Sequence, residues 1–496
     1  MQKNGKSALI NFIERYYYIF LAVVLFAACF NVLYNLDKYP INSWDEARHG
    51  VSAYEMLKNN NLIVNTYAFE KDYWNLKPPL SFWLISLGYK LAGYNTIGLR
   101  LFSAIAALIT IVLTALFSKH LFGRLASLIS SAVLTTTTQY ILSHCARSGD
   151  ADSLHVLFFT AAVVSTALIG LNSKWLYMAG LSFSLSFLTK SWHALSIPVI
   201  IGLYLLISKA LFKIKLKEWI VFAFCSFSPI FLWGILRYVS DGLEFFKMMI
   251  NTDLLARTSN TLEGHTGSPS YYLATLQYGY FGWLLILAGS FIFYLAAAHL
   301  NHGSRTPKNQ VLLLLLWISV PLLFYTVAST KITWYILPVF PALAICIGAL
   351  CSKIIKASNR YVLLQLLIIS AIAFSLYKNE NTILSDVLSA RPDDIQATLQ
   401  KTQSLNEYRG ARIYTLCGDV KSPECWRQCD LLAAELYGNL VPRDGGLEPF
   451  IKNKSKALIM VPKDKKYINM TKNMDFRILA EGPTSYIIGN LKAPEL

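Results

Sequence analysis

The stretch at 16–36, YYYIFLAVVLFAACFNVLYNL, decides the fold class of this 496-residue chain. It carries no charged residue and is long enough to cross a bilayer, which takes about 20 apolar residues. Similar runs follow at 101–121, 125–142 and 311–328. Because 54% of the residues are hydrophobic and only 15% are charged, the chain is more apolar than typical soluble domains. The sequence therefore predicts an all-α polytopic membrane protein.

Hydropathy predicts about 11 to 13 membrane-spanning helices. The eleven that we place lie at about 16–36, 97–118, 125–143, 153–171, 175–190, 192–208, 218–238, 281–299, 311–328, 334–351 and 361–377. The first run continues without a small-residue cleavage site, so we expect a retained helix rather than a signal peptide.

The net charge of +16 follows the predicted topology rather than indicating nucleic acid. With the N-terminus in the cytoplasm, cations gather in the cytoplasmic segments and only Glu14 and Glu218 oppose them, as the positive-inside rule requires. These cations are Lys3, Lys6, Arg15, Lys119, Arg124, Lys174, Lys209, Lys213, Lys215, Lys217, Arg305, Lys308, Lys353, Lys356 and Arg360. An odd number of spans then predicts a multi-pass protein of the inner (plasma) membrane with its C-terminus in the periplasm or outside the cell.

Two long outer segments, 37–96 and 239–280, are too polar to be simple connectors. Within the first, the apolar stretch 80–92 is too short to span and predicts an interfacial or re-entrant helix. From residue 378 hydropathy falls and short strand-like runs appear. We therefore expect a transmembrane catalytic domain at 1–377 and a soluble extracytoplasmic α/β domain at 378–496.

Three cysteines, Cys417, Cys425 and Cys429, lie in the predicted C-terminal domain. An oxidising outer compartment would permit one disulfide among them, with its pairing left open. A zinc site is less expected, since no fourth ligand stands at a familiar spacing.

The strongest local feature is the outer segment Trp44-Asp45-Glu46-Ala47-Arg48-His49, directly after the first span. One carboxylate there could accept a proton from an acceptor hydroxyl or hold a cationic group near the membrane surface. The alternative is a solvated, charged loop.

A second acidic segment runs from His144 to Asp152 between the third and fourth spans. If the segment is helical, Asp150 and Asp152 diverge, so only one of them should face the cavity of Asp45. Arg147 could offset that carboxylate or bind a phosphate through two of its N–H groups. A structural ion pair at the turn is the alternative.

Three lysines, Lys77, Lys190 and Lys331, stand in outer turns beside aromatic residues. Each could be an interfacial cation that only snorkels to the membrane surface. Together with Arg147 and Arg257, they would form a cationic pocket suited to a lipid-linked phosphate. His265 could contact substrate or a metal.

These segments resemble the polyprenyl-phosphate-dependent glycosyltransferases of the GT-C fold, especially bacterial aminoarabinose (lipid A) transferases and protein O-mannosyltransferase-like proteins. Trp44 to Arg48 is similar to the Asp-Glu-x-Arg motif of the family's first outer loop, and Lys77-Pro78-Pro79-Leu80 to its Lys-Pro-Pro-Leu segment. The other similar segments are Gly98-Leu99-Arg100, Ala146 to Asp152, Phe187 to Lys190, and Lys331 to Pro338 with Tyr335.

The resemblance implies an inverting sugar transfer from a polyprenyl-phosphate donor to an envelope lipid, glycan or protein. Asp45 would be the catalytic carboxylate, with Glu46, Arg48 and Asp152 in the same centre. Substrate-binding candidates are Arg48, Lys77, Arg147, Lys190, Arg257, His265, Lys331 and Tyr335. Many aminoarabinose transferases have Glu directly before Lys-Pro-Pro, where this chain has Leu76, so no metal ligand is assigned, although a divalent metal stays possible.

Two other functions remain open at this point. A transporter or flippase of lipid-linked sugars would place ionisable residues near the middle of the membrane on broken, repeated helices. A nonenzymatic envelope protein could keep the same fold. The sequence names neither the sugar, nor the acceptor, nor the oligomeric state.

Overall fold

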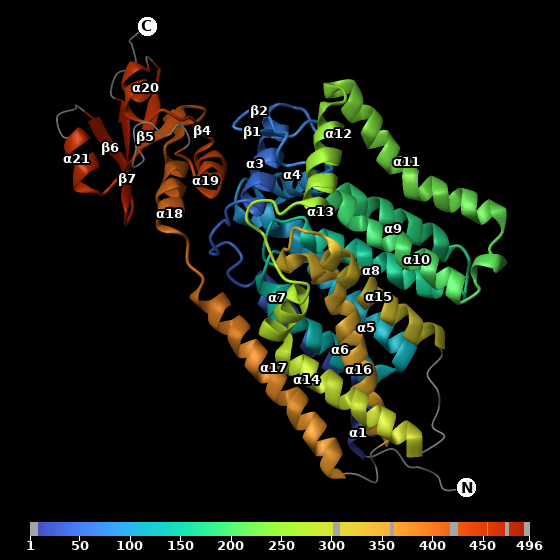
Figure 1. The fold of residues 1–496 in the computed structure, drawn as a ribbon. Helices are drawn as coiled ribbons and strands as arrows, with labels where there is room; N and C mark the ends of the chain where they lie inside the picture. Colours follow the sequence, from blue (N-terminus) through green and yellow to red (C-terminus); the bar gives the residue numbers. More distant parts are fainter. Residues whose placement is uncertain are drawn as a thin grey trace.

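The computed structural model describes residues 8–300, 308–357, 362–416, 425–453, 455–471 and 476–490. Long helices form the larger part, and a smaller part with a β-sheet follows the last long helix (Figure 1). The short α1 lies at one end of the helical part, whereas the sheet lies beyond the opposite end (Figure 1).

The helical part begins with α1 at Ala8–Arg15 and ends with α17 at Val362–Ser389. Between them lie α2 Tyr17–Leu33, α3 Asp45–Lys58, α4 Leu80–Ala92, α5 Thr96–Phe122, α6 Arg124–Thr135, α7 Thr138–Leu142, α8 Asp152–Leu168, α9 Trp175–Lys190, η1 Ser191–Leu195, α10 Ser196–Ile207, η2 Leu211–Lys213, α11 Leu216–Asp241, α12 Glu244–Met248, η3 Met249–Ala256, α13 Arg257–Ser259, α14 Tyr271–Leu300, α15 Lys308–Val327, η4 Thr333–Val339 and α16 Phe340–Ala357. A two-stranded sheet, β1 Thr66–Tyr67 and β2 Glu70–Lys71, lies in the first outer segment.

Seven segments in the described part of the chain are long and apolar enough to cross a membrane. They are Thr96–Phe122, Trp175–Ile207, Leu216–Asp241, Tyr271–Leu295, Lys308–Val327, Thr333–Lys356 and Leu363–Ser389. Four shorter apolar helices, α2, α4, α6 and α8, fall below that length. The chain is thus a multi-span protein, and the count of eleven spans stays a prediction.

The segment Trp175–Ile207 corresponds to two predicted spans. Ser191, with a φ of 49°, ends α9, and the turn η1 leads into α10. Because α9 ends and α10 begins at this turn, the break that we predicted between 190 and 192 is present.

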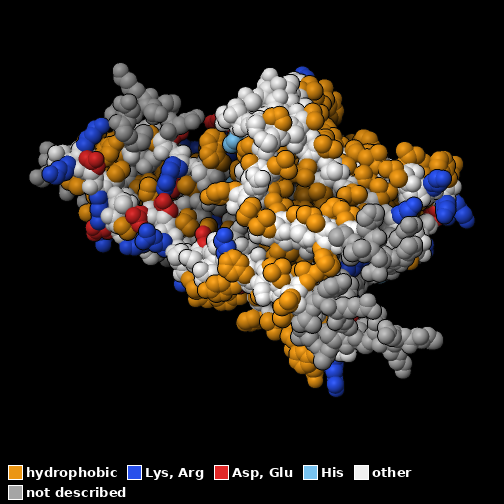
Figure 2. Space-filling view, turned by 60° about the horizontal axis from the view of Figure 1, so that its bottom comes forward, with side chains coloured by type: hydrophobic (Ala, Val, Ile, Leu, Met, Phe, Trp, Pro, Cys, Tyr) orange, Lys and Arg blue, Asp and Glu red, His pale blue; other side chains and the backbone are white. Residues whose placement is uncertain are grey.

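Apolar side chains cover the outside of the helical part, as expected of a surface that faces lipid. Helix α11 shows this most clearly, with exposed Phe224, Phe231 and Leu232 along its length. Figure 2 shows hydrophobic side chains spread over the helices, while Lys, Arg, Asp and Glu gather over the C-terminal part. This difference supports lipid as the solvent of the helical part alone.

The interior packs α5, α6 and α16 closely together. At Gly348 of α16 an added Cβ would meet the Ala126 carbonyl oxygen of α6 at 2.5 Å. Helices α4 and α5 touch in the same way, because an added Cβ at Gly88 would lie 2.1 Å from the Gly98 carbonyl oxygen. These contacts fix α4, the predicted interfacial helix, against the helical part.

The C-terminal part holds a five-stranded sheet of order β4-β3-β5-β7-β6. Strands β4, β3 and β5 are parallel, whereas β7 and β6 pair antiparallel. The elements are α18 Asp394–Gln400, η6 Lys401–Ser404, η7 Asn406–Tyr408, β3 Arg412–Thr415, α19 Gln428–Gly438, β4 Val441–Pro442, α20 Leu447–Lys452, β5 Ala457–Pro462, α21 Lys465–Thr471, β6 Phe476–Glu481 and β7 Ser485–Asn490. Helix α17 runs without a break across the proposed boundary at 377/378.

Helix α19 packs against α3 and so joins the C-terminal part to the first outer segment. The Tyr54 hydroxyl of α3 donates to Asn439 Oδ1 at 2.7 Å. Cys425 is disulfide-bonded and Cys429 is free and buried, while Cys417 lies outside the described residues. Of the three cysteines considered, Cys429 is therefore not in the disulfide.

Candidate functional site

Helix α3 begins at Asp45, so the Asp-Glu pair forms the first turn of a helix that the sequence reading left unassigned. Trp44 precedes it with a φ of 66°, in the left-handed region that a Trp rarely adopts. Its carbonyl accepts the Arg48 amide at 2.8 Å, which closes the first turn. Two carboxylates at a helix N-terminus also suit the positive end of the helix dipole.

Glu46 is fully buried and its carboxylate is saturated with donors. Arg100 of α5 binds it through Nε to Oε1 at 2.6 Å and through Nη2 to Oε2 at 3.0 Å. The Gly149 amide and the Asn42 amide each donate to it at 2.8 Å. The remaining Arg100 donors reach backbone carbonyls at 2.7 to 2.9 Å. Glu46 thus ties three outer segments together and has no oxygen left for a substrate.

Asp45 has the opposite environment from its neighbour. Its side chain is half-buried, and no described residue donates a hydrogen bond to its carboxylate or forms an ion pair with it. Its charge nevertheless acts on the surrounding groups. Burial alone would lower the pKa of Arg257, but nearby negative charges, Asp253 and Asp45 among them, raise it. The Asp45 carboxylate is therefore a free acceptor close to a cation.

Asp150, rather than Asp152, pairs with the histidine of the second acidic segment. His144 Nδ1 lies 2.8 Å from Asp150 Oδ2, and its ring stacks on Trp334 with centroids 3.6 Å apart. Burial alone would lower the pKa of His144, but the charge and hydrogen bond of Asp150, with smaller contributions from Asp152 and Asp45, raise it to about 9. His144 is therefore a cation at neutral pH, close enough for Asp45 to act on it.

Asp152 begins α8 and is buried in an ion pair with Lys190 at the end of α9. The Lys190 ammonium also lies 5.5 Å from the centroid of the Tyr335 ring. The two acids of the second segment therefore have different partners. Asp150 precedes α8, so the helical spacing that we considered for the pair does not apply.

Asp253, in the second outer segment, forms ion pairs with Lys77 and Arg257. Lys77 Nζ lies 3.0 Å from its Oδ1, and Arg257 Nε lies 3.2 Å from the same oxygen. The Ser191 hydroxyl donates to Oδ2 at 2.8 Å. Burial alone would raise the pKa of Asp253, but Lys77 and Arg257 hold it below its ordinary value.

A cavity opens beside these cations, between η1, η3 and η4. Its lining residues combine aromatic rings with charged groups and are Trp192, His193, Asp253, Leu254, Arg257, Thr258, Phe324, Tyr325, Ala328, Thr330 and Tyr335. Of the three cations, Arg257 lines the cavity itself, and Lys77 shares its partner Asp253. Arg257 also lies 3.9 Å from Glu263. A guanidinium at the wall of a cavity suits an anionic ligand such as a phosphate.

Two other predicted cations bind backbone carbonyls instead. Arg147 Nη1 donates to the carbonyls of Asn31 and Val32 at 2.9 and 3.0 Å, at the end of α2. Lys331 Nζ donates to carbonyls at the end of α15, including that of Thr326 at 2.7 Å. Both side chains satisfy helix-end carbonyls that would otherwise lack a donor.

Arg48 and His265 are the two remaining candidates. Arg48 is held between the rings of Tyr67 and Trp74, at 4.3 and 4.2 Å, and its Nη2 lies 3.2 Å from Asp72. The half-buried His265 contributes a backbone carbonyl to the Lys331 amide at 3.1 Å. No contact of its imidazole is recorded among the described residues.

Metal ions in proteins are commonly held by groups of His, Cys, Asp or Glu side chains. Among the described residues, no group of three His, Cys, Asp or Glu side chains is arranged to hold one. Leu76, which precedes Lys77, is buried in an apolar cluster with Phe159 and Phe245. A metal ligand at this position would require a different local environment.

Sequence reasoning left four important partners out of the candidate site: Arg100, His144, Asp150 and Asp253. Arg100 appeared only within the Gly98-Leu99-Arg100 motif, and Asp253 lies in the polar outer segment 239–280 without a motif of its own. A signal for Arg100 existed, because a charged residue near the start of an apolar span must find a partner.

Known proteins that are similar to this chain are glycosyltransferases. The family of dolichyl-phosphate-mannose-protein mannosyltransferases matches residues 76–233. An undecaprenyl phosphate-alpha-4-amino-4-deoxy-L-arabinose arabinosyl transferase from Pectobacterium carotovorum is 28% identical over 350 residues, which are 68% of this chain and 59% of that protein. The chain therefore spans about three fifths of that relative's length.

Solved structures share the fold. ArnT from Cupriavidus metallidurans, bound to undecaprenyl phosphate, superimposes with a TM-score of 0.69 at 17% identity, covering 96% of this chain and 98% of ArnT. The oligosaccharyltransferase AglB from Archaeoglobus fulgidus gives a TM-score of 0.52 at 10% identity, covering 90% of this chain and 70% of AglB. The chain thus has the GT-C fold and is similar to the polyprenyl-phosphate-dependent glycosyltransferases, aminoarabinose transferases in particular.

Proposed function

We propose that this protein is an inverting glycosyltransferase that moves a sugar from a polyprenyl phosphate to an acceptor in the cell envelope. The observation that carries the proposal is the free carboxylate of Asp45 close to Arg257, which shares the partner Asp253 with Lys77. This is the pairing of base and anion site that the reaction needs. The similarity to arabinosyl and mannosyl transferases supports the same chemistry.

In the proposed reaction Asp45 accepts the proton of an acceptor hydroxyl as its oxygen attacks the anomeric carbon. A new C–O bond forms on one face of the sugar while the bond to the phosphate oxygen breaks on the other. The polyprenyl phosphate leaves with the bonding electron pair. The configuration at the anomeric carbon is inverted because the reaction is a single displacement.

We propose that the cavity beside Tyr335 takes the donor phosphate, with Lys77, Lys190 and Arg257 as its cationic contacts. Asp253 and Asp152 hold these side chains in place in the free protein through their ion pairs. Negative charge that builds up on the leaving phosphate would be stabilised by donors already in position. The aromatic rings of Trp192 and Tyr325 would exclude water from this part of the site.

Glu46, Arg48 and Asp152 act as positioning residues in this proposal. Glu46 and Arg100 fix the start of α3, and with it Asp45. Arg147 and Lys331 bind helix-end carbonyls, so we place both outside the phosphate site, and we leave His265 at its rim.

We further propose that this centre faces the extracytoplasmic side of the inner membrane. The N-terminus would be cytoplasmic, eleven spans would cross the bilayer, and the part of the chain that follows α17 would form an outer α/β domain beside the site. The distribution of Lys and Arg supports this orientation. So does the position of α3, α4, β1 and β2 at the end of the helical part nearer the sheet (Figure 1).

We propose an envelope lipid, glycan or protein as the acceptor. The name of the arabinosyl transferase relative contains an undecaprenyl-phosphate-linked sugar, which supports a lipid-linked donor. A transporter would be expected to carry its ionisable groups along a path through the membrane, whereas here they gather at helix ends around one cavity.

The test is the Asp45→Asn variant, incubated in proteoliposomes with membrane lipid extract as the source of donor and acceptor. Release of polyprenyl phosphate, measured by mass spectrometry, should fall about 10²–10⁴-fold, the usual contribution of a general base. Retention of the donor lipid should not change, since Asp45 lies outside the cationic cluster. Glu244→Gln, an exposed carboxylate on α12, is the matched control. Release at the control rate would refute the role of Asp45.

A further inference from the structure

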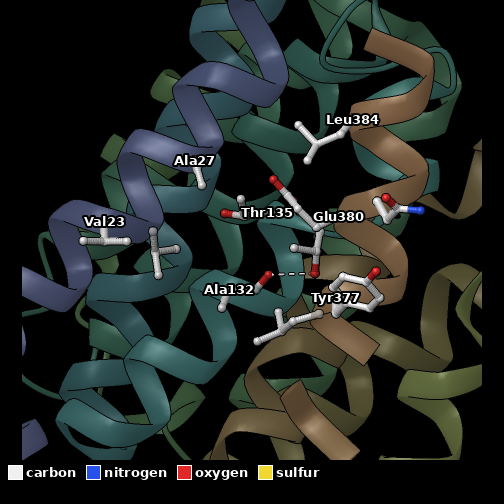
Figure 3. Close-up of a pocket in the computed structure, with 11 residues that line it drawn as sticks. Val23, Ala27, Ala132, Thr135, Tyr377, Glu380 and Leu384 are labelled. Atoms are coloured by element: carbon white, nitrogen blue, oxygen red, sulfur yellow. Dashed lines mark hydrogen bonds between the residues drawn. The ribbon is translucent and has the colours of Figure 1, made fainter. Parts of the chain in front are cut away.

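We propose that a groove between α2, α6 and α17 binds the ammonium headgroup of a phospholipid of the phosphatidylethanolamine class. Figure 3 shows this groove, with side chains of α2 on one side, of α17 on the other and of α6 between them. Its lining residues are Val23, Val24, Ala27, Ala132, Thr135, Thr136, Leu376, Tyr377, Glu380, Asn381 and Leu384. None of these residues belongs to the centre around Asp45, so the site is independent of the proposed reaction.

Glu380 is the one charged residue in the lining of this groove. It stands in α17 within the candidate span Leu363–Ser389. Carboxylates inside membrane spans are rare and usually mark a binding site or a pathway. Asn31 Nδ2 donates to Glu380 Oε2 at 2.9 Å, while no described residue donates to Oε1. One oxygen of Glu380 is therefore available to a ligand.

Two more polar atoms near Glu380 lack partners: the hydroxyl of Thr135, which lines the groove, and the amide oxygen of Asn31, which binds Glu380. Asn31 Oδ1 and Thr135 Oγ1 are buried and make no hydrogen bond, and the two side chains are 0% and 1% exposed. Buried polar atoms are almost always hydrogen-bonded, because an unpaired one loses its water without replacement. An excess of acceptors beside a carboxylate calls for a cation that carries several N–H donors. A primary ammonium has three such donors.

The rest of the groove matches the other parts of such a lipid. Tyr377 and Asn381, on the same helix as Glu380, can donate hydrogen bonds to a phosphate. The apolar side chains of Val23, Val24 and Leu376 continue the groove along α2 and α17, where they suit an acyl chain. The groove thus offers acceptors, donors and an apolar wall, as a zwitterionic phospholipid requires.

The experiment is native mass spectrometry of the delipidated full-length protein in detergent. Phosphatidylethanolamine, phosphatidylcholine and phosphatidylglycerol with identical acyl chains are added separately. The wild type should retain phosphatidylethanolamine most strongly, because phosphatidylcholine has no N–H donor and phosphatidylglycerol no cation. Equal retention of the three lipids would overturn the proposal.

Substitutions in the groove test whether phosphatidylethanolamine binds there. Glu380→Gln should reduce phosphatidylethanolamine retention about tenfold, as expected for loss of a charge-assisted hydrogen bond. Thr135→Val, which keeps the side-chain shape, should reduce it by a smaller factor and serves if Glu380→Gln does not fold. Glu244→Gln should bind like the wild type. The proposal is wrong if either groove variant that folds also retains the lipid as the wild type does.

Discussion

Glu46 and Arg100, 54 positions apart, form a two-point ion pair in which both side chains are fully buried. Arg100 also binds the carbonyls of Leu36 and Pro40 at 2.8 and 2.7 Å. The pair therefore joins the segment that follows α2, the start of α3 and the start of α5. Because α3 begins with Asp45, this ion pair determines where the proposed base stands.

Breaking the pair from one side should be costly. Arg100→Met leaves the Glu46 charge buried without a partner, and loss of one member of a buried pair costs about 3–5 kcal/mol. Thermal unfolding in detergent should show a large drop in midpoint, partly restored by adding Glu46→Gln. The exposed pair of Lys452 with Glu448 is the control, since Lys452→Met should cost about 0–1 kcal/mol. Similar midpoints for Arg100→Met and Lys452→Met would contradict this role.

Lys77 and Lys331 should behave differently although both were predicted to bind substrate. Lys77→Met removes a charged donor from the proposed phosphate site, which is worth about 1.5–3 kcal/mol, or roughly 10–100-fold in affinity. Lys331→Met should leave affinity unchanged and lower the unfolding midpoint, because carbonyls at the end of α15 lose their donor. Titration with a sugar-free polyprenyl phosphate measures the affinity. Equal weakening by both variants would show that Lys331 belongs to the phosphate site.

The ion pair of His144 with Asp150 should make stability depend on pH. The pKa of His144 is raised from 6.5 to about 9 in the folded protein, so the pair stabilises the fold fully below the unfolded value. This stabilisation is lost as the pH rises through about 9. The midpoint difference between wild type and His144→Gln should be largest near pH 6 and should shrink above pH 9. His120→Gln, an exposed histidine of α5, should show no such trend. A pH-independent difference for His144→Gln would exclude the pairing.

The contact of α4 with α5 should not tolerate a methyl group. An added Cβ at Gly88 would lie 2.1 Å from a backbone oxygen of Gly98, so Gly88→Ala must separate the two helices. Overpacking of this kind costs about 1–3 kcal/mol. Gly202 of α10 has nothing within 4 Å, and Gly202→Ala should be neutral or stabilising by up to about 1 kcal/mol. Unfolding midpoints of the two variants test this, and equal values would contradict the close contact.

Hydropathy predicted the apolar helices well because lipid exposure leaves a continuous apolar stretch, as in α5 and α11. Family motifs pointed to Asp45 and Lys77. The pairings were not predictable, since Glu46 with Arg100 and Lys77 with Asp253 join segments far apart in the chain. The position of Arg147 in the sequence also could not show that its side chain binds carbonyls at the end of α2 rather than facing the cavity.

The boundary near 378 shows another limit of reading hydropathy. The apolar character of α17 fades after Tyr377, and we placed the end of the last span there. The helix continues to Ser389, because a polar sequence can extend a helix that has already formed. Glu380 consequently stands in a groove of the helical part rather than in a separate domain.

The most direct test of the central claim is mass spectrometry of envelope lipids, glycans and proteins from cells that lack the gene. Cells complemented with the wild type or with Asp45→Asn at equal membrane levels are compared with them. The account predicts a sugar-sized mass increase in one acceptor fraction that only the wild type restores. It is contradicted if no fraction differs between these cells, or if Asp45→Asn restores the modification as well as the wild type does.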